Sequence, residues 1–324
     1  RPRQENCLRS FIFGKDSGRL QIAIINQIFI YKTTVSPFES ELDQNSKQTI
    51  NGYSYSSFMN PSKHKNSLLY KITGNGLKKP SYLLGTMHMI SGKDFYLREK
   101  VMKAMNKCSI YYMEVDLGSA QQVQSMGQKL PVITDISEGL SISEKEDLDH
   151  LLQKQFGLSL EEARQQPPVT LISRMATDVI DSDDVRMVEV ELLKIAQEKD
   201  LKTAGLETAL QQLKIAQKVF TGKEILRQLN SADAYKVAFG KMVKAYRSEN
   251  LQELAMLVTD EKFMSKKAFN ILVINRNKRW AKAIPLLIES QNAFIAVGAG
   301  HLPGEQGLLQ LLIEKGYAVN PVYR

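Results

Sequence analysis

Two histidines of this 324-residue chain occupy equivalent places in two similar motifs. The stretch GTMH (85–88) ends an apolar run near the start, and GAGH (298–301) ends another near the finish. In each, a glycine precedes the histidine by three residues and allows a sharp turn and the close approach of another group. Imidazole binds metal ions and transfers protons near neutral pH. His88 and His301 are therefore candidates for a shared metal or acid–base site.

A carboxylate is the third candidate component. The run SIYYMEVDL (109–117) predicts a strand, and its alternation places Tyr112, Glu114 and Asp116 on one face. An acid in a strand covered on both faces is costly unless a cation or a histidine compensates. Two imidazoles and a carboxylate, with an open position for water, form a common catalytic metal set, and a further carboxylate can act as general base. Ordinary buried, hydrogen-bonded residues remain an open alternative.

The other histidines and the cysteines do not indicate a second site. His64 lies in a polar segment and His150 in a charged helix, so we expect both at the surface. Cys7 and Cys108 are too few for a disulfide framework or a cysteine zinc site.

Composition bounds the class of protein. Hydrophobic residues make up 43% and charged residues 24% of the chain, as in ordinary globular proteins. The net charge is +8, but there is no run of five or six basic residues, so we expect no nucleic-acid partner. No apolar stretch reaches 18 residues, so we expect no integral membrane segment.

The order of elements predicts an α/β fold with a mostly parallel sheet. A strand, a helix and a strand follow one another over 81–88, 97–107 and 109–117, which favours a parallel unit. A largely helical middle follows, with a short strand over 201–207, and the end returns to strand, loop, helix and strand from 293. The histidines then lie at strand ends, where open α/β sheets bind ligands. The middle is a large helical insertion between the two βαβ-like parts.

The N-terminal part has a different character. Residues 39–66 are rich in Ser and Asn without periodicity, so we expect 1–66 to be a poorly structured leader and 67–324 to be the folded domain. The apolar stretch 20–31 follows two basic residues, which is either a remnant of an export signal or a buried strand. Export or a cell-envelope location is expected, with a cytoplasmic location as the alternative.

The motifs, taken in order, resemble the TraB/PrgY/GumN family, which includes the Tiki-like metalloproteases. The stretches that carry the resemblance are SYLLGTMHMISGKDFY, YYMEVDL, GLET, RNKRWAKAI and FIAVGAGHLPGEQGLLQLLIEKGYAV. They cover roughly residues 67–324. The family looks related in fold to erythromycin esterases and to ChaN-like haem-binding proteins, and many of its members are bacterial.

The resemblance implies a metal-dependent hydrolase, a peptidase acting on a peptide or protein substrate. It implies that His88, His301 and Glu114 lie at a divalent metal, manganese or cobalt, with zinc as an alternative. Both histidines would bind the ion, and Glu114 would either complete the ligand set or act as a catalytic residue that activates water. Two other functions stay open: a non-catalytic protein that sequesters a peptide or haem, and a metal-free esterase that uses the same His/Glu cleft. The oligomeric state is unknown from the sequence.

Two further residues are catalytic candidates. Glu207 follows a short strand, so it is either part of the cleft or an acid interacting with a helix dipole. Arg276 lies in the RNKRW motif, where a guanidinium would stabilise an oxyanion or bind a substrate carboxylate; the alternative is a helix-surface arginine. Trp280 follows by four residues on the same helix face and is expected to pack in the core.

Overall fold

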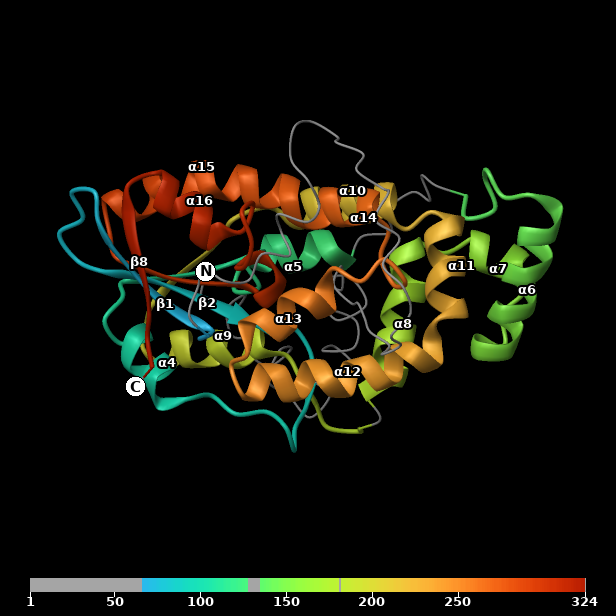
Figure 1. The fold of residues 1–324 in the computed structure, drawn as a ribbon, viewed down its shortest axis with the longest axis horizontal. Coiled ribbons are helices and arrows are strands. Elements are labelled where there is room, and N and C mark those ends of the chain that lie inside the picture. Colours follow the sequence, from blue (N-terminus) through green and yellow to red (C-terminus); the bar gives the residue numbers. More distant parts are fainter. Residues whose placement is uncertain (1–65, 128–134, 181, 324) are drawn as a thin grey trace, which may run out of the picture.

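A computed structural model describes residues 66–127, 135–180 and 182–323. The fold is elongated, with a β-sheet at one end and a helical region at the other (Figure 1). All but the last residue of the predicted leader 1–66, including His64 and the stretch 20–31, lie outside the described residues. No helix in the described ranges combines the length and the apolar character that crossing a membrane requires.

The six-stranded sheet is mostly parallel, as the sequence predicts. Its spatial order is β6 (Lys202–Gly205), β4 (Ile110–Met113), β7 (Ala293–Gly298), β2 (Ser81–Thr86), β1 (Leu69–Gly74) and β8 (Tyr317–Pro321). Strands β6, β4, β7 and β2 are mutually parallel, and β1 pairs antiparallel with both β2 and β8. A second, two-stranded sheet pairs β3 (Ile90–Ser91) with β5 (Val185–Arg186).

Helices cover both faces of the large sheet. In Figure 1, α15 (Asn275–Glu289) and α16 (Leu308–Glu314) lie on one side of it, and α4 (Glu99–Met105) and α9 (Val188–Glu198) lie on the other. Every residue of β2, β4 and β7 is buried as a result. This explains why these strands are continuous apolar runs in the sequence rather than alternating ones.

The predicted helical insertion forms the other end of the molecule. Its helices are α5 (Ala120–Gly127), α6 (Ile142–Phe156), α7 (Leu160–Arg164), α8 (Pro168–Ile180), α10 (Ala209–Val219), α11 (Gly222–Asn230), α12 (Ala232–Arg247), α13 (Leu251–Val258) and α14 (Lys266–Phe269). Part of it has its own hydrophobic cluster, which includes Leu148, Phe220 and Leu272. The insertion is not continuous, because the chain returns through α9 and β6 to the edge of the sheet.

Helix α6 begins with a capping box formed by Ser141 and Glu144, in which Ser141 has the extended backbone of an N-cap. One local prediction needs correction. The strand predicted over 109–117 ends at Met113. Glu114 therefore lies just beyond the strand end and not within a strand.

Candidate functional site

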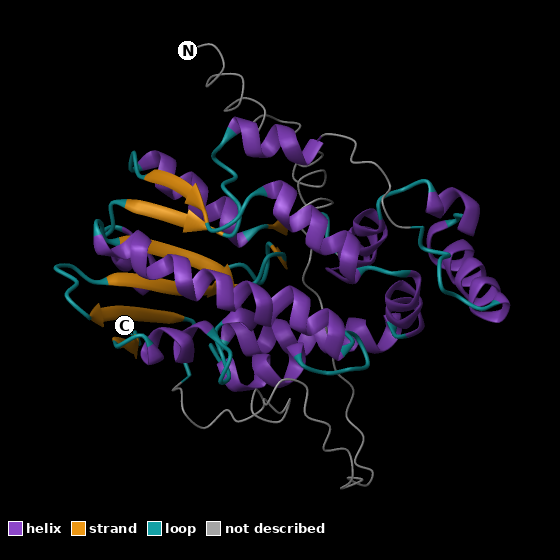
Figure 2. Ribbon diagram, turned by 90° about the horizontal axis from the view of Figure 1, so that it is seen from above, coloured by secondary structure: helices purple, strands orange, loops and turns teal. Residues whose placement is uncertain are grey.

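Four parallel strands end at one edge of the sheet, and each is followed by a candidate residue. His88 follows β2, His301 follows β7, Glu114 follows β4 and Glu207 follows β6. Figure 2 shows that the arrowheads of the parallel strands point toward the helical region. The candidate site thus lies where the sheet meets that region, as expected for the carboxyl ends of strands in an open α/β sheet.

The two histidines and Glu114 face one another. Nε2 of His88 and Nε2 of His301 each lie 3.7 Å from Oε1 of Glu114. All three residues are buried, with exposed fractions of 8%, 0% and 6% for His88, His301 and Glu114. The geometric prediction made from the two motifs, that their imidazoles meet at one sheet edge, agrees with this arrangement.

The glycines of the two motifs pack into each other's loops. A Cβ atom added to Gly85 would lie 3.0 Å from the Cα of Ala299, in the other motif. One added to Gly298 would lie 3.0 Å from Nε2 of His88 and 3.5 Å from Oε1 of Glu114. The backbone of Gly298 has φ −52°, so the requirement for glycine is one of space and not of backbone strain.

Asn277 fixes the ring of His301. Its Nδ2 donates to the carbonyl oxygens of His301 (3.2 Å) and Gln306 (2.8 Å), so its Oδ1 faces Nδ1 of the ring at 2.5 Å. The proton of the ring is therefore on Nδ1, and Nε2 presents a lone pair toward Glu114. Burial lowers the pKa of His301 well below its usual value, against the opposing effect of Glu114. His301 is neutral at physiological pH.

Glu189, from α9, fixes the ring of His88. Its Oε1 accepts from Nδ1 of His88 at 2.6 Å and from Oγ1 of Thr86 at 2.5 Å. Burial lowers the pKa of His88, but the charges of Glu189 and Glu114 more than offset this and raise it to about 9. In the absence of another cation His88 is therefore protonated.

Arg276 lies inside the cluster and not on the helix surface. Its guanidinium is fully buried and contacts two acids, with Nη2 2.5 Å from Oε2 of Glu114 and 2.5 Å from Oε1 of Glu207. Its Nη1 donates to the carbonyl of Leu272 (3.3 Å) and lies 3.3 Å from Nε2 of His301. Leu272 belongs to a π-helical turn (Asn270–Ile274) that precedes α15, a distortion often found at functional sites.

Glu207 also belongs to the cleft. Besides Arg276, its carboxylate accepts from Nη2 of the half-exposed Arg279 at 3.0 Å. It lies before Thr208, the N-cap of α10, so its partner is the arginine pair and not the helix dipole. Trp280 is buried, as predicted, and its ring lies 4.5 Å from both the His301 ring and the Arg276 guanidinium.

Neighbouring charges and a backbone hydrogen bond hold Glu114 ionised against the effect of burial. Burial raises its pKa, but Arg276, then the two histidines and the backbone N–H of Gly298 lower it far below the usual value. The Gly298 N–H donates to Oε1 at 2.8 Å, and Nε2 of Gln212 donates to Oε2 at 3.1 Å. A carboxylate so well supplied with donors is a poor proton acceptor and a good fixed anion.

Three residues of the site, Glu189, Asn277 and Gln212, are not predicted from the sequence. A signal existed for two of them: Glu189 shares the apolar face of its helix with Leu192 and Leu193, and Asn277 shares one with Trp280 and Ala281. A polar residue on an otherwise apolar helix face requires a buried partner. Gln212 lies in a more mixed helix and carries no comparable signal.

A model of the TraB/PrgY/gumN family matches residues 68–321. The chain belongs to this family. The resemblance read from the motifs is thereby confirmed at the level of the family. No curated protein and no solved structure matched the chain. The part that matches the TraB/PrgY/gumN family contains all of the strand ends and helices that build the site.

The donor atoms of His88, His301 and Glu114 can be compared with the ligands of a metal ion. Within the described part of the chain, no group of three or more His, Cys, Asp and Glu side chains already has ion-binding geometry. The separations of 3.7 Å are nevertheless close to the roughly 3.4 Å between two ligands of one tetrahedral ion. Two separations within this set of donors are thus compatible with one ion, whereas Nη1 of Arg276 lies 3.3 Å from Nε2 of His301 on the same side.

Charge and hydrogen bonding also fit a cation. The acids Glu114, Glu189 and Glu207 outnumber the arginines Arg276 and Arg279 by one, so the cluster needs a further positive charge. A protonated His88 would balance it, and a divalent ion with a neutral His88 would leave one positive charge for an anionic ligand. In addition, Oε2 of Glu189 and Oε1 of Gln212 are buried acceptors without a hydrogen-bond donor among the described residues. Such atoms cost about 1–3 kcal/mol each unless water or an ion supplies a partner.

Proposed function

We propose that this protein is a metal-dependent hydrolase in which His88, His301 and Glu114 bind one divalent ion, manganese or cobalt. The observation that carries the proposal is the matched orientation of the histidines. Each has its Nδ1 fixed by a side-chain oxygen, and each presents Nε2 to the same oxygen of Glu114. Metal-ligating histidines are held in this way, by a hydrogen bond from the second ring nitrogen.

The bound ion would polarise a substrate carbonyl and lower the pKa of a water molecule. The protein's part is to hold three donors in place. Glu114, kept ionised by Arg276, serves better as a ligand than as a general base, since an effective base has a pKa near the working pH. Arg276 already donates to Glu114, Glu207 and the Leu272 carbonyl, which makes it a positioning residue for Glu114.

The proposed substrate is a peptide bond. The support is the likeness of the motifs to those of Tiki-like members, because the buried cluster itself does not distinguish an amide from an ester. A peptide substrate is also compatible with a net charge that gives no basic tract for nucleic acid.

One contact favours a second candidate, hydrolysis without metal. Nη1 of Arg276 lies 3.3 Å from Nε2 of His301, so a protein cation already faces the position where an ion would bind. In that case the neutral His301 would take a proton from water, and Glu114 would have to stabilise the charged ring against the burial that lowers the pKa of this histidine. The two candidates predict opposite responses to chelation.

The experiment measures metal content and cleavage together. Full-length protein without a histidine tag is analysed for metal, and then assayed on a peptide library with and without chelator. We expect about one ion per chain and cleavage that chelator abolishes and manganese or cobalt restores. His301→Ala should lose both, whereas His150→Ala, at an exposed histidine of α6, should lose neither.

Cleavage that survives chelation would replace the metal mechanism with the metal-free one. Peptide binding without turnover, in the presence of metal, would show a non-catalytic protein and contradict the proposal.

A further inference from the structure

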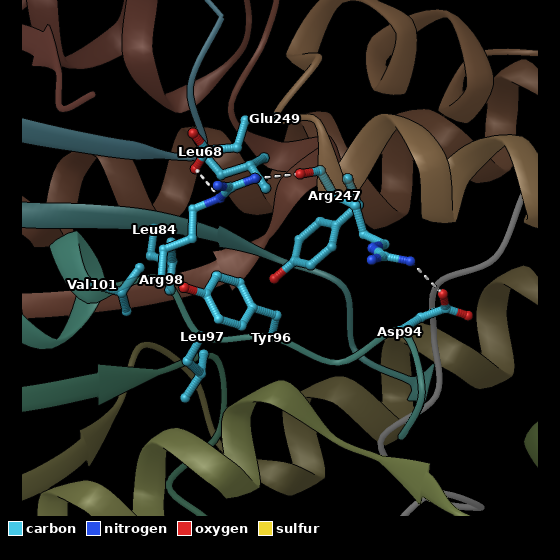
Figure 3. A pocket seen from close by; sticks show the side chains of 10 residues that line it. Leu68, Leu84, Asp94, Tyr96, Leu97, Arg98, Val101, Arg247 and Glu249 are labelled. Carbon is cyan, nitrogen blue, oxygen red and sulfur yellow. Dashed lines mark hydrogen bonds and ion pairs between the residues drawn. The ribbon is translucent and has the colours of Figure 1, made fainter. Parts of the chain in front are cut away.

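A pocket of about 140 Å³ lies beside the site, between the start of α4, the end of α12 and the ends of β1 and β2. Figure 3 shows the side chains that line it. Leu68, Leu84 and Val101 are buried and, with Leu97, form its apolar lining. Tyr96, which is 66% exposed, stands at the opening.

The volume limits what the pocket can hold. An apolar cavity of about 150 Å³ holds one benzene molecule. A pocket of about 140 Å³ therefore accepts one phenyl ring or one branched aliphatic group, and it is too small for a long acyl chain.

The rim of the pocket carries more positive than negative charge. Arg247 is balanced, because its Nη1 lies 2.7 Å from Oδ1 of Asp94. Glu249 lies 2.6 Å from Nζ of the buried Lys100 but 3.6 Å from Nε of Arg98, so its charge is mainly neutralised by the lysine. Arg98, with a side chain 41% exposed, is partly engaged as well, because its Nε faces Glu249 and its Nη2 donates to the carbonyl of Arg247 (Figure 3). Its Nη1 has no partner among the described residues, and the three basic groups Arg98, Lys100 and Arg247 face only the two acids Asp94 and Glu249.

We propose that this pocket binds an apolar side chain together with an adjacent carboxylate, as found at the C-terminus of a peptide ending in Phe or Leu. The ring or branched group would fill the apolar lining, and Arg98 would bind the carboxylate. Guanidinium groups bind carboxylates with paired, charge-assisted hydrogen bonds, which makes arginine suited to this recognition.

Tyr246 connects the pocket to the loop that carries His88. This residue lines the pocket, and its hydroxyl hydrogen-bonds to the backbone of Met87, next to His88. From Leu84 to His88 the chain spans at most about 14 Å, or four residues of extended peptide. That the occupant belongs to a cleaved peptide rests on the proposed function, whereas binding to the pocket does not.

Calorimetric titration of the full chain in chelator tests binding without hydrolysis. The probes are acetyl-Gly-Gly-Phe with a free carboxylate, the same peptide as its C-terminal amide, and free phenylalanine. We expect the acid to bind at least tenfold more tightly than the amide, which is the size of effect that one charge-assisted hydrogen bond gives. Tight binding of free phenylalanine as well would assign the pocket to the amino acid itself.

Two arginine variants distinguish specific binding of the carboxylate by Arg98 from a general effect of the protein's positive charge. Arg98→Gln should weaken binding of the acid at least tenfold and leave binding of the amide unchanged. Arg164→Gln is the matched control, because its side chain is also 41% exposed and ion-paired but lies in the helical region. Equal affinity for acid and amide, an unaltered Arg98→Gln, or no binding of any probe at millimolar concentration would each overturn the proposal.

Discussion

Glu114 is the residue on which the site depends, because it accepts from donors on three different elements. Arg276 of α15, Gln212 of α10 and the backbone of Gly298 at the end of β7 all donate to it. Its Oε1 is, in addition, the common neighbour of both histidines. A single carboxylate thus determines the charge and the geometry of a cluster assembled from distant parts of the chain.

Glu114→Gln should lower hydrolysis by about 10²–10⁴ and lose bound metal. The sequence alone favours an unchanged or raised melting temperature for this variant, on the reasoning that a functional charge is removed. The contacts reverse that expectation: Arg276 would lose a buried partner, which costs roughly 3–5 kcal/mol. Activity, metal content and melting temperature are measured on the same preparation.

The control for Glu114→Gln is Asp116→Asn, the other acid after β4. Among the described residues, the carboxylate of Asp116 accepts only from the nearby backbone N–H of Gly118, at 3.0 Å, so this variant should keep its metal and most of its activity. Full hydrolysis by Glu114→Gln would exclude Glu114 from the mechanism and leave Asp116 or Glu207 as the acid to test.

His88 should make stability fall at alkaline pH in metal-free protein. The folded state raises its pKa from 6.5 to about 9, so its contribution is full below pH 6.5 and is lost as the pH rises to about 9. The shift corresponds to at most about 3 kcal/mol. Denaturant unfolding between pH 6.5 and 9.5 measures it.

The matched comparison for that measurement is His88→Gln. Its free energy of unfolding should depend less on pH over the same range. Equal slopes in the two proteins would mean that His88 is neutral in the fold. The acidic side is governed by other groups. His301 and Glu114 both have lowered pKa values in the fold, so the unfolded state takes up protons first and stability decreases as the pH falls.

At the scale of elements, the sequence predicts individual strands better than their order in the sheet. Strand β7 begins at the predicted residue 293 and ends at the glycine of its motif, because an apolar run between a polar turn and a glycine has few alternative lengths. The insertion of β7 between β2 and β4 is not predictable in this way, since pairing joins strands about 180–210 residues apart in the chain. The same applies to Glu189, whose role depends on where α9 packs.

Arg276 shows most clearly which features of the site the local sequence does not predict. Its sequence neighbours are polar and basic, which is typical of an exposed helix face, and yet its exposed fraction is zero. Burial of a guanidinium is acceptable only when its partners are buried with it. Those partners, Glu114 and Glu207, follow strands β4 and β6, far from Arg276 in the chain, so local sequence cannot reveal them.

The reciprocal packing of the two G-x-x-H loops predicts the effect of Gly298→Ala. The new methyl group would press on Nε2 of His88, at 3.0 Å, and on Glu114. We expect activity to fall at least tenfold with a loss of stability of about 1–3 kcal/mol from overpacking. Gly240→Ala in α12 meets no atom within 4 Å and should gain about 0.5–1 kcal/mol at unchanged activity.

At the scale of the whole molecule, the site lies where two hydrophobic clusters meet. One cluster fills the space around the large sheet, and the other lies in the helical region. The π-helical turn and α15 run through both: Leu272 and Val273 belong to the helical cluster, and Trp280 and Ile284 to the sheet cluster. Arg276 lies on this helix between the two sets, so the position of its guanidinium depends on both parts of the fold.

This division predicts that the helical region opens independently of the sheet. Leu148→Ala, at a fully buried position of α6, should cost about 2–5 kcal/mol. If the clusters are separate units, the loss should appear in amide hydrogen exchange of α6, α8 and α11, while amides of β2 and β7 keep their protection. Leu309→Ala, in α16 and equally buried, should give the reverse pattern. A uniform loss of protection in both variants would instead show one cooperative unit, and the site would then open only when the whole domain unfolds.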